Sequence, residues 1–332
     1  MRSFCQSEND VPRKPFVSAE RFKEVWHQTG GSPSKVAEIL GLAGVSSASR
    51  RRLFIERKEG IVLRTSAPFA ARNNEIKKQT NRRVEITVPN GTILIGSDAH
   101  CWPGEMTTAQ KGFIHLAEKL KPDVVVMNGD VFDGARISRH PAGIWEQEKR
   151  PNVKEELEAC QEFLGRVSKA ATGARKLWTL GNHDARMEYT LAALVPQYEG
   201  VPGFALKDHF PEWSLCMAVF VNNSLVIKHR HANGIHAAYN NAVRSGRTMV
   251  TGHLHSLKVT PWTDYNGTRY GVDCGTLADP TSKQFDYAEE APMNHRAGFV
   301  VLTLKDGRLM MPELCQVWDE DHIEFRGEIL RV

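Results

Sequence analysis

The sequence predicts an α/β sandwich that follows a small all-α N-terminal domain. Two observations predict this fold class. Residues 18–60 contain three short runs with helical spacing, and from Val84 onward strand-sized apolar runs alternate with helical segments. The composition, with 41% hydrophobic and 25% charged residues over 332 positions, excludes a disordered tail protein, a disulfide miniprotein and a collagen-like fibre.

The N-terminal helices have clear start and stop signals. The first follows Ser18, a good N-cap, and stops at Gly30-Gly31; the second runs from Ser32-Pro33 to Gly41; the third spans residues 46–58 and closes at Gly60. Three short helices with a basic third helix are typical of a helix-turn-helix. We therefore predict a DNA-binding domain in residues 1–62 that uses Arg50, Arg51, Arg52, Arg57 and Lys58. The alternative is a helical bundle whose arginines only form a solvated face.

Charge is distributed unevenly along the chain. Residues 1–83 hold 17 Lys and Arg against 8 Asp and Glu, whereas residues 84–332 hold 26 against 31, so a net +4 divides into +9 and −5. Residues 63–85 contain few large apolar side chains and predict a basic linker. The basic segment favours nucleic acid, and DNA in particular, as a partner, while the acidic body counts against a dedicated DNA groove.

The body shows alternating elements in order. Predicted helices cover 107–120, 153–170 and about 235–243, and predicted strands cover 92–96, 124–127, 176–180, 218–221, 225–228, 248–250, 258–262, 270–272 and 299–304. Six cysteines without a Cys-x-x-Cys pair, together with a start that lacks a secretory apolar region, predict a reducing cytoplasm. No apolar run approaches the roughly 20 residues that cross a bilayer, so no membrane partner is expected.

Polar residues follow five of these strands directly. The segments are Asp98-x-His100, Gly129-Asp130-x-x-Asp133, Gly181-Asn182-His183-Asp184, His229-Arg230-His231 and Gly252-His253-x-His255. An open α/β sheet forms its ligand crevice at the carboxyl ends of its strands. Two divalent cations need a bridging carboxylate, imidazoles and open positions for water and a phosphoryl oxygen. Ligation by His, Asp and Asn without thiolate favours Mn²⁺, with Fe, Zn, Ni and Mg as alternatives.

These motifs resemble the calcineurin-like metallophosphoesterase superfamily over residues 92–304. The resemblance implies a four-layer sandwich, two mixed sheets flanked by helices, for residues 86–332. It implies a first metal bound by Asp98, His100, Asp130 and His255, and a second bound by Asp130, Asn182, His253 and the histidine that ends the preceding strand. The family usually has His-Gly there, so His229 is expected to be that ligand, with His231 as the alternative.

The resemblance also implies catalytic roles. His183 would protonate the leaving oxygen or stabilise its developing charge, and Asp184 would orient the ring. Asp133 would order the metal-bearing loop or form an ordinary turn. Candidate substrate contacts are Arg136, Arg139, His140 and Arg230, the first three of which could instead form a surface loop. Four histidines lack a motif partner and are expected outside the site, namely His115, His209, His236 and His295.

The expected function is metal-dependent hydrolysis of a phosphodiester, with DNA as the expected substrate. A basic helical module on such a body resembles calcineurin-like nucleases or phosphoesterases of bacteriophages and prophages, which act in the host cytoplasm. One alternative is a phosphomonoesterase or a phosphodiesterase for small molecules or cyclic nucleotides. A second alternative is a non-catalytic DNA-binding regulator on an inactive scaffold.

Overall fold

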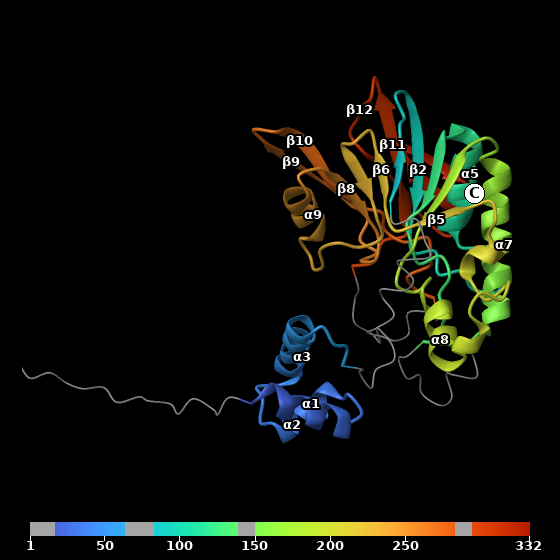
Figure 1. The fold of residues 1–332 in the computed structure, drawn as a ribbon. Coiled ribbons are helices and arrows are strands. Elements are labelled where there is room, and N and C mark those ends of the chain that lie inside the picture. Colours follow the sequence, from blue (N-terminus) through green and yellow to red (C-terminus); the bar gives the residue numbers. More distant parts are fainter. Residues whose placement is uncertain (1–16, 64–82, 139–149, 283–293) are drawn as a thin grey trace, which may run out of the picture. The chain divides into compact units, whose positions relative to one another are not determined.

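The computed structural model describes residues 17–63, 83–138, 150–282 and 294–332 (Figure 1). The chain divides into two compact units, residues 1–73 and 74–332. Most of the predicted linker lies outside the described residues. Among the described residues, no helix is both long enough and apolar enough to span a membrane.

The N-terminal unit consists of α1 (Ala19–Gln28), α2 (Pro33–Ile39) and α3 (Val45–Glu59). Ser18 begins α1, because its side chain accepts a hydrogen bond from the backbone of Arg21 at 3.1 Å. Gly60 ends α3 in the left-handed conformation. The helices share a small core of Phe22, Val25, Trp26, Val36, Ala37, Ala48, Ile55 and Leu63. The expected all-α domain is therefore present.

The second unit contains two mixed sheets. The first has the order β15 (Glu328–Arg331), β14 (His322–Phe325), β13 (Glu313–Val317), β11 (Gly298–Lys305), β2 (Gly91–Gly96), β3 (Val124–Met127), β4 (Arg175–Thr179) and β5 (Ser214–Cys216), with β12 (Arg308–Leu309) paired to β11. The second has the order β1 (Val84–Ile86), β6 (Val219–Val221), β7 (Leu225–Ile227), β8 (Thr248–Thr251), β10 (Gly267–Asp273) and β9 (Lys258–Asp264).

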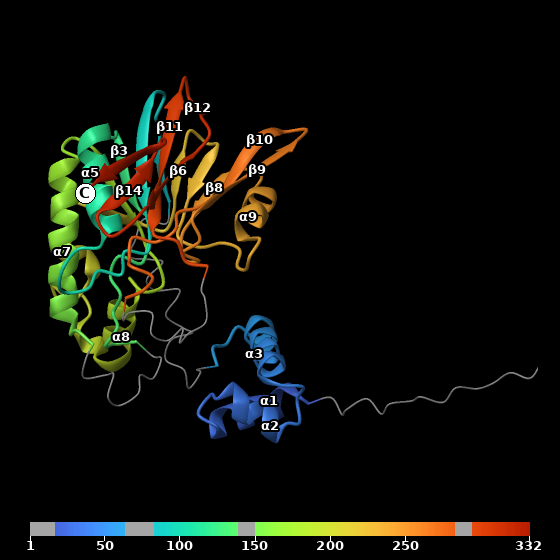
Figure 2. The same ribbon diagram turned by 180° about the vertical axis from the view of Figure 1, so that it is seen from behind.

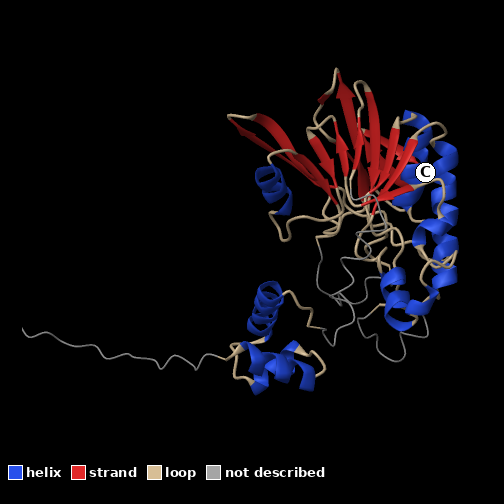
Figure 3. Ribbon diagram, viewed as in Figure 1, coloured by secondary structure: helices blue, strands red, loops and turns tan. Residues whose placement is uncertain are grey.

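The layers follow from the alternation of apolar side chains along the strands. In β2, Ile93 and Ile95 belong to the core between the sheets, whereas Leu94 belongs to the core under the helices. The helices α5 (Thr108–Leu120) and α7 (Val153–Ala170) cover the first sheet, and α9 (Ala237–Ser245) covers the second (Figures 1 and 3). This arrangement confirms the predicted four-layer sandwich.

Most predicted elements agree with the structure within three residues at their ends. Elements that the sequence patterns did not predict are β1, the short β5, α8 (Arg186–Leu194), two 3-10 helices (Pro196–Tyr198 and Leu206–His209) and the C-terminal strands from β12 onward. The strands β2, β3, β4 and β5 are parallel, as are β7, β8 and β10. Their carboxyl ends meet at one edge of the sandwich, where loops gather (Figures 2 and 3).

Candidate active site

Backbone hydrogen bonds hold the first two motif loops side by side. Past the end of β2, the amide of Asp98 donates to Gly129 O at 2.9 Å and the amide of His100 donates to Asp130 O at 3.0 Å. The ladder between β2 and β3 thus continues into both loops. Asp98 and Asp130 are both buried in these adjacent loops.

Several residues predicted to bind metal have a strained backbone conformation. Five of the predicted ligands have φ between 39° and 72°, namely Asp98, His100, Asp130, His253 and His255. This region is unfavourable for residues with a Cβ, costs about 1–3 kcal/mol each, and is found mainly at functional sites. Only five other non-glycine residues among the described ones share it. The fold therefore tolerates strain in order to aim these side chains inward.

The ligand atoms fall into two clusters. Asp98, His100 and His255 form the first, with His255 Nε2 3.1 Å and His100 Nε2 4.0 Å from Asp98 Oδ1. Asp130, His229 and His253 form the second. Within each cluster the donor atoms lie within 4.8 Å of one another, as the ligands of one metal ion must.

His229, rather than His231, occupies the second cluster. Its Nε2 lies 3.0 Å from Asp130 Oδ2, and the ring is almost completely buried. Its Nδ1 lies 2.8 Å from Asn128 O, so Nδ1–H donates to this carbonyl and Nε2 faces the cluster. His231 is exposed. Of the two histidines that the motif left open, His229 is therefore the one whose ring lies in the cluster.

The charges of the site fit divalent cations. Burial raises the pKa of Asp98, but His255 and His229 more than offset it and hold the pKa at about 2. Burial likewise lowers the pKa of His229, whereas Asp130 and Asp98 raise it to about 10. The buried carboxylates thus attract positive charge. Asn182 Oδ1 is buried and accepts no hydrogen bond from the described residues, which suits a metal ligand.

His183 lies beside the second cluster, and Asp133 orients it. Asp133 Oδ1 is 2.5 Å from His183 Nδ1 and 2.9 Å from His100 Nδ1, so one carboxylate holds both rings. For His100, the proton on Nδ1 leaves Nε2 facing the first cluster. His183 Nε2 lies 3.9 Å from Asp130 Oδ2. Burial lowers the pKa of His183, but Asp130 and Asp133 together raise it above its ordinary value.

Asp184 has a different role from the predicted one. Its carboxylate is fully buried and accepts five hydrogen bonds, from the backbone amides of Asp130, Val131, Phe132 and Gly181 and from Trp178 Nε1. Among the described residues, none of its hydrogen bonds goes to the His183 ring. The prediction that Asp184 orients His183 is therefore wrong, because the chain turns this side chain inward, under the Asp130 loop. Asp184 fixes the loop that carries Asp130.

We expect Asp184→Asn to lower the free energy of unfolding by about 2–4 kcal/mol. Each carboxylate oxygen accepts at least two N–H groups at 2.8–3.1 Å, so an amide nitrogen in either place would face donors. Urea unfolding measures the effect, with the exposed Asp279→Asn as the control. If Asp184→Asn kept the stability of the wild type and lost only turnover, the result would support the predicted role of Asp184 in orienting His183.

Two motif glycines are required by close approach. A Cβ on Gly181 would overlap the Asp130 side chain, and one on Gly252 would overlap the side chains of Ser97 and Asp98. The missing Cβ at Gly252 lets the backbone of β8 approach β2. The amide of His253 then donates to Asp98 Oδ2 at 2.9 Å. Gly181 therefore allows its loop to meet the loop that carries Asp130, and Gly252 allows its loop to meet the loop that carries Asp98.

Gly252→Ala should destabilise the protein by about 1–3 kcal/mol or more, because the added methyl group has no space. Gly165→Ala is the matched control. Gly165 lies in α7, where an added methyl group would meet open space, so alanine there should raise stability by about 0.5–1 kcal/mol. Thermal unfolding of both variants gives the comparison, and equal shifts of Tm would contradict the steric argument.

The remaining predicted residues are placed as follows. Arg136 and Arg230 are exposed, while Arg139 and His140 lie outside the described residues. In α3, Arg50, Arg57 and Lys58 are exposed. Arg51 donates to Val17 O at 2.7 Å, and Arg52 lies over the Trp26 ring and 3.6 Å from Glu56. These two cations therefore face their own unit.

Two residues near the site were not predicted. Arg186, at the start of α8, places one guanidinium nitrogen 3.0 Å from His183 Nε2 and donates through the other to Asp133 O at 2.8 Å. Because arginine only donates, His183 Nε2 is the acceptor in this arrangement. His295 was expected outside the site, but its ring centroid lies 4.5 Å from that of His255. No motif marked either residue, and the helix that begins at Arg186 was itself missed.

Comparisons with known proteins agree with this geometry. A family model for the calcineurin-like phosphoesterases matches residues 91–269. The chain belongs to this family. It is therefore a metal-dependent phosphoesterase, and its matched region contains the strands and loops that carry the two clusters. Divalent cations bound in this family's site would supply Lewis-acid polarisation of a phosphoryl oxygen and an activated water.

The chain is also similar to individual phage proteins and to solved structures. The Gene 54 proteins of Mycobacterium phage L5 and Mycobacterium phage D29 are each 27% identical, over 252 and 245 residues, which cover 68% of this chain and 93% of each relative. Wild-type Vps29 from Entamoeba histolytica, complexed with Zn²⁺, is 13% identical with a TM-score of 0.37 and covers 73% of this chain and 98% of its own. YfcE, a phosphoesterase from E. coli, is 14% identical with a TM-score of 0.34 and covers 72% and 96%.

Proposed function

We propose that this phosphoesterase is a two-metal phosphodiesterase that cleaves DNA, encoded by a phage or prophage and acting in the host cytoplasm. The observation that carries the proposal is the union, in one chain, of two adjacent ligand clusters with a separate basic helical unit. The similarity to two phage proteins supports the source. The metals would be Mn²⁺, which suits mixed His, Asp and Asn ligation.

The ligand set follows the two clusters. Asp98, His100, Asp130 and His255 would hold the first cation, and Asp130, Asn182, His229 and His253 the second. Asp130 is the candidate bridge, because its carboxylate is buried between His229 and the His183 amide, which donates to Oδ1 at 2.8 Å. Asn182 Oδ1, which is buried and has no hydrogen-bond partner among the described residues, supports the second site.

His183 would give the leaving oxygen a proton from Nε2, after this nitrogen has exchanged its contact with Arg186 for a proton from water. Asp130 and Asp133 favour the protonated ring, because they raise the pKa of His183. Asp133 fixes the ring through Nδ1, and Arg186 occupies Nε2 in the free protein. A leaving oxygen at Nε2 would take the place of this arginine contact, so Arg186 would release His183 and remain beside the reacting ester as a cation. The residues thus provide an acid whose orientation is set by its neighbours.

The N-terminal unit would raise the local concentration of DNA at the metal centre. We propose that α3 is the recognition helix of a helix-turn-helix and that Arg50, Arg57 and Lys58 contact phosphates, since these three are exposed. Arg51 and Arg52 would support the unit's own packing instead. A helical bundle with a solvated basic face is the competing interpretation.

A substrate panel tests the reaction. Manganese-loaded protein would be given bis-p-nitrophenyl phosphate, p-nitrophenyl phosphate, and labelled single- and double-stranded DNA. We expect turnover of the diester and cleavage of DNA. Turnover of the monoester alone would replace the proposal with a phosphomonoesterase. Turnover of the diester without cleavage of DNA would indicate a small-molecule phosphodiesterase. No turnover with Mn, Fe, Zn, Ni or Mg would indicate a non-catalytic regulator.

Charge removal tests the N-terminal unit. A variant with Arg50→Gln, Arg57→Gln and Lys58→Gln should bind DNA more weakly, and the slope of log affinity against log salt should fall by about one unit per lost phosphate contact. The control removes three exposed cations from α7, through Lys154→Gln, Arg166→Gln and Lys169→Gln. Equal DNA affinity of the two triple variants would favour the solvated bundle.

A further inference from the structure

The acidic body contains a long stretch without acidic residues. Residues 213–263 hold five Lys and Arg and no Asp or Glu. One residue in eight of the body is acidic, so about six would be expected in 51 positions. The rest of the body therefore carries the whole negative charge. A net charge of −5 describes the average and hides a local cationic region.

From β6 onward this stretch folds on one side of the sandwich, whereas its first strand, β5, belongs to the other sheet. It forms β5, β6, β7, α9, β8 and most of β9, so it makes up much of the second sheet and the helix that covers it (Figures 1 and 2). Its loops after β7 and β8 carry His229, His253 and His255. The acid-free region therefore begins inside the metal centre and extends outward across α9.

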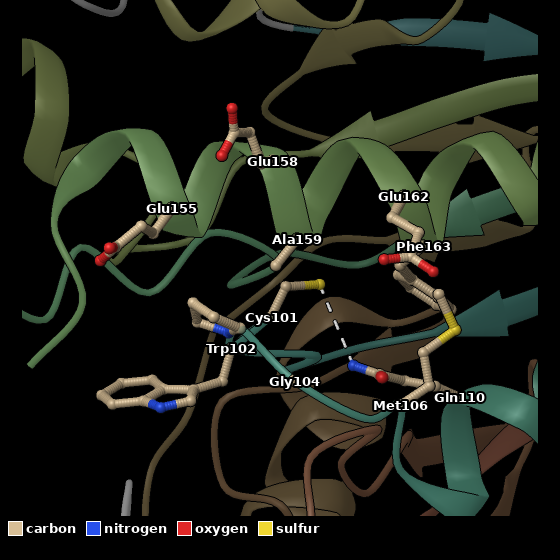
Figure 4. Close-up of a pocket in the computed structure, with 11 residues that line it drawn as sticks. Cys101, Trp102, Gly104, Met106, Gln110, Glu155, Glu158, Ala159, Glu162 and Phe163 are labelled. Carbon is tan, nitrogen blue, oxygen red and sulfur yellow. Dashed lines mark hydrogen bonds between the residues drawn. The ribbon is translucent and has the colours of Figure 1, made fainter.

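The opposite side has the opposite character. A pocket of about 230 Å³ begins at Cys101, one residue past His100. In Figure 4 the helix α7 places Glu155, Glu158 and Glu162 along this pocket, opposite Cys101 and Gln110. Glu158 and Glu162 pair with Lys154 and Arg166 of their own helix at 3.3 and 3.0 Å. The residues that line this pocket include three carboxylates and no Lys or Arg, so the pocket offers a phosphate chain no cation of its own.

Cations lie between the metal centre and the outer surface of α9. Arg230 directly follows the cluster residue His229, and Arg230, His231 and Arg244 are exposed. The Ala232 amide donates to Asn241 of α9 at 2.8 Å, which ties the loop to the helix. Arg230 and Arg244 therefore lie on a loop and a helix that this hydrogen bond joins.

An aromatic side chain follows on the same helix. Tyr239 is 39% exposed, and its ring lies edge-on to Trp262 of β9 with centroids 5.3 Å apart. An exposed ring fixed by a second ring offers a flat face on which a base can stack. Cationic groups with a neighbouring aromatic face are typical of surfaces that bind single-stranded nucleic acid.

We propose that the surface formed by Arg230, His231, Arg244 and Tyr239, here called the α9 track, binds the single strand that flanks the scissile phosphodiester. This inference rests on the proposed phosphodiesterase function and names its substrate as a polynucleotide strand. Arg230 and Arg244 hold phosphates on one side of the cleaved bond, and Tyr239 stacks on a base. A small diester fills the metal centre alone and does not reach Arg244.

The test compares long and short substrates on the full-length protein. For Arg244→Gln, we expect KM for a single-stranded 12-nucleotide DNA to rise by about three- to tenfold relative to KM for bis-p-nitrophenyl phosphate. Arg247→Gln is the matched control, because Arg247 belongs to the same stretch but precedes β8 at the end away from the metal centre and pairs with Asn223. Its ratio of the two KM values should equal that of the wild type.

The outcomes separate the two proposals. Equal ratios for Arg244→Gln and Arg247→Gln, with DNA cleavage intact, would overturn the α9 track and leave the phosphodiesterase function standing. Absence of cleavage of any diester by the wild type would overturn the proposed function itself. Tyr239→Leu should also raise KM for the 12-mer. If Arg244→Gln weakens inhibition by polyphosphate as much as it weakens binding of DNA, and Tyr239→Leu has no effect on either, the α9 track binds polyanions in general and not nucleic acid.

Discussion

Asp130→Asn is expected to lower phosphodiester turnover by about a thousandfold, which corresponds to about 4 kcal/mol of transition-state stabilisation. The variant should also lose bound metal. Asp130 is buried, lies 3.0 Å from His229, and accepts the His183 amide at 2.8 Å, so it links the second cluster to the catalytic histidine. Elemental analysis after gel filtration and turnover of bis-p-nitrophenyl phosphate measure the two effects.

Asp306→Asn is the matched control for this variant. Asp306 is also an aspartate in the left-handed region, with φ of 50°, but it lies in an exposed turn. It should retain metal and turnover. Two bound metals per chain in Asp130→Asn would show that this carboxylate is not the bridge.

His183→Asn is expected to lower turnover by about 10²- to 10⁴-fold while the metal content stays unchanged. The ring is held by Asp133 and belongs to neither proposed ligand set, so its loss removes a proton donor rather than a metal ligand. His27→Asn, which changes an exposed histidine of α1 outside the metal centre and the α9 track, is the control.

The leaving group provides a stricter test of His183. A nitrophenolate leaves without much protonation, whereas the alkoxide of a DNA sugar needs a proton. The loss of turnover in His183→Asn should therefore be larger for DNA than for bis-p-nitrophenyl phosphate. An equal loss on both substrates would assign His183 to charge stabilisation instead of proton donation.

Local patterns were sufficient to predict the elements around the site. The strands that end at Gly96, Met127 and Thr251 are apolar runs followed by a motif, and their parallel pairing brings the motifs to one edge. The missed elements lack such local signals. Strand β1 is three residues long and pairs with β6, more than 130 positions away, so its partner cannot be seen in a sequence window.

The roles of Asp133 and Asp184 show the limit of adjacency in sequence. Asp184 follows His183 directly, which suggested that it orients the ring, yet five N–H donors hold it in the interior. Asp133 is 50 positions from His183 and makes that contact at 2.5 Å. Side-chain direction in a turn depends on which buried donors must be satisfied, and this becomes known only when the loops are placed together.

Counts of charge were similarly incomplete. Five cations in residues 50–58 predicted one basic face, but Arg51 and Arg52 use their guanidinium groups within their own unit. In the body, a sum of −5 hid residues 213–263, which contain no acid at all. Sums over a segment do not distinguish paired from exposed charge, nor one side of a sheet from the other.

Anomalous diffraction from crystals grown with Mn²⁺ tests the two-metal centre most directly. We predict two manganese peaks about 3.5–4 Å apart, with Asp130 between them, Asp98, His100 and His255 around one and Asn182, His229 and His253 around the other. A single peak, or two peaks that do not share Asp130, would contradict a dinuclear centre built on this carboxylate.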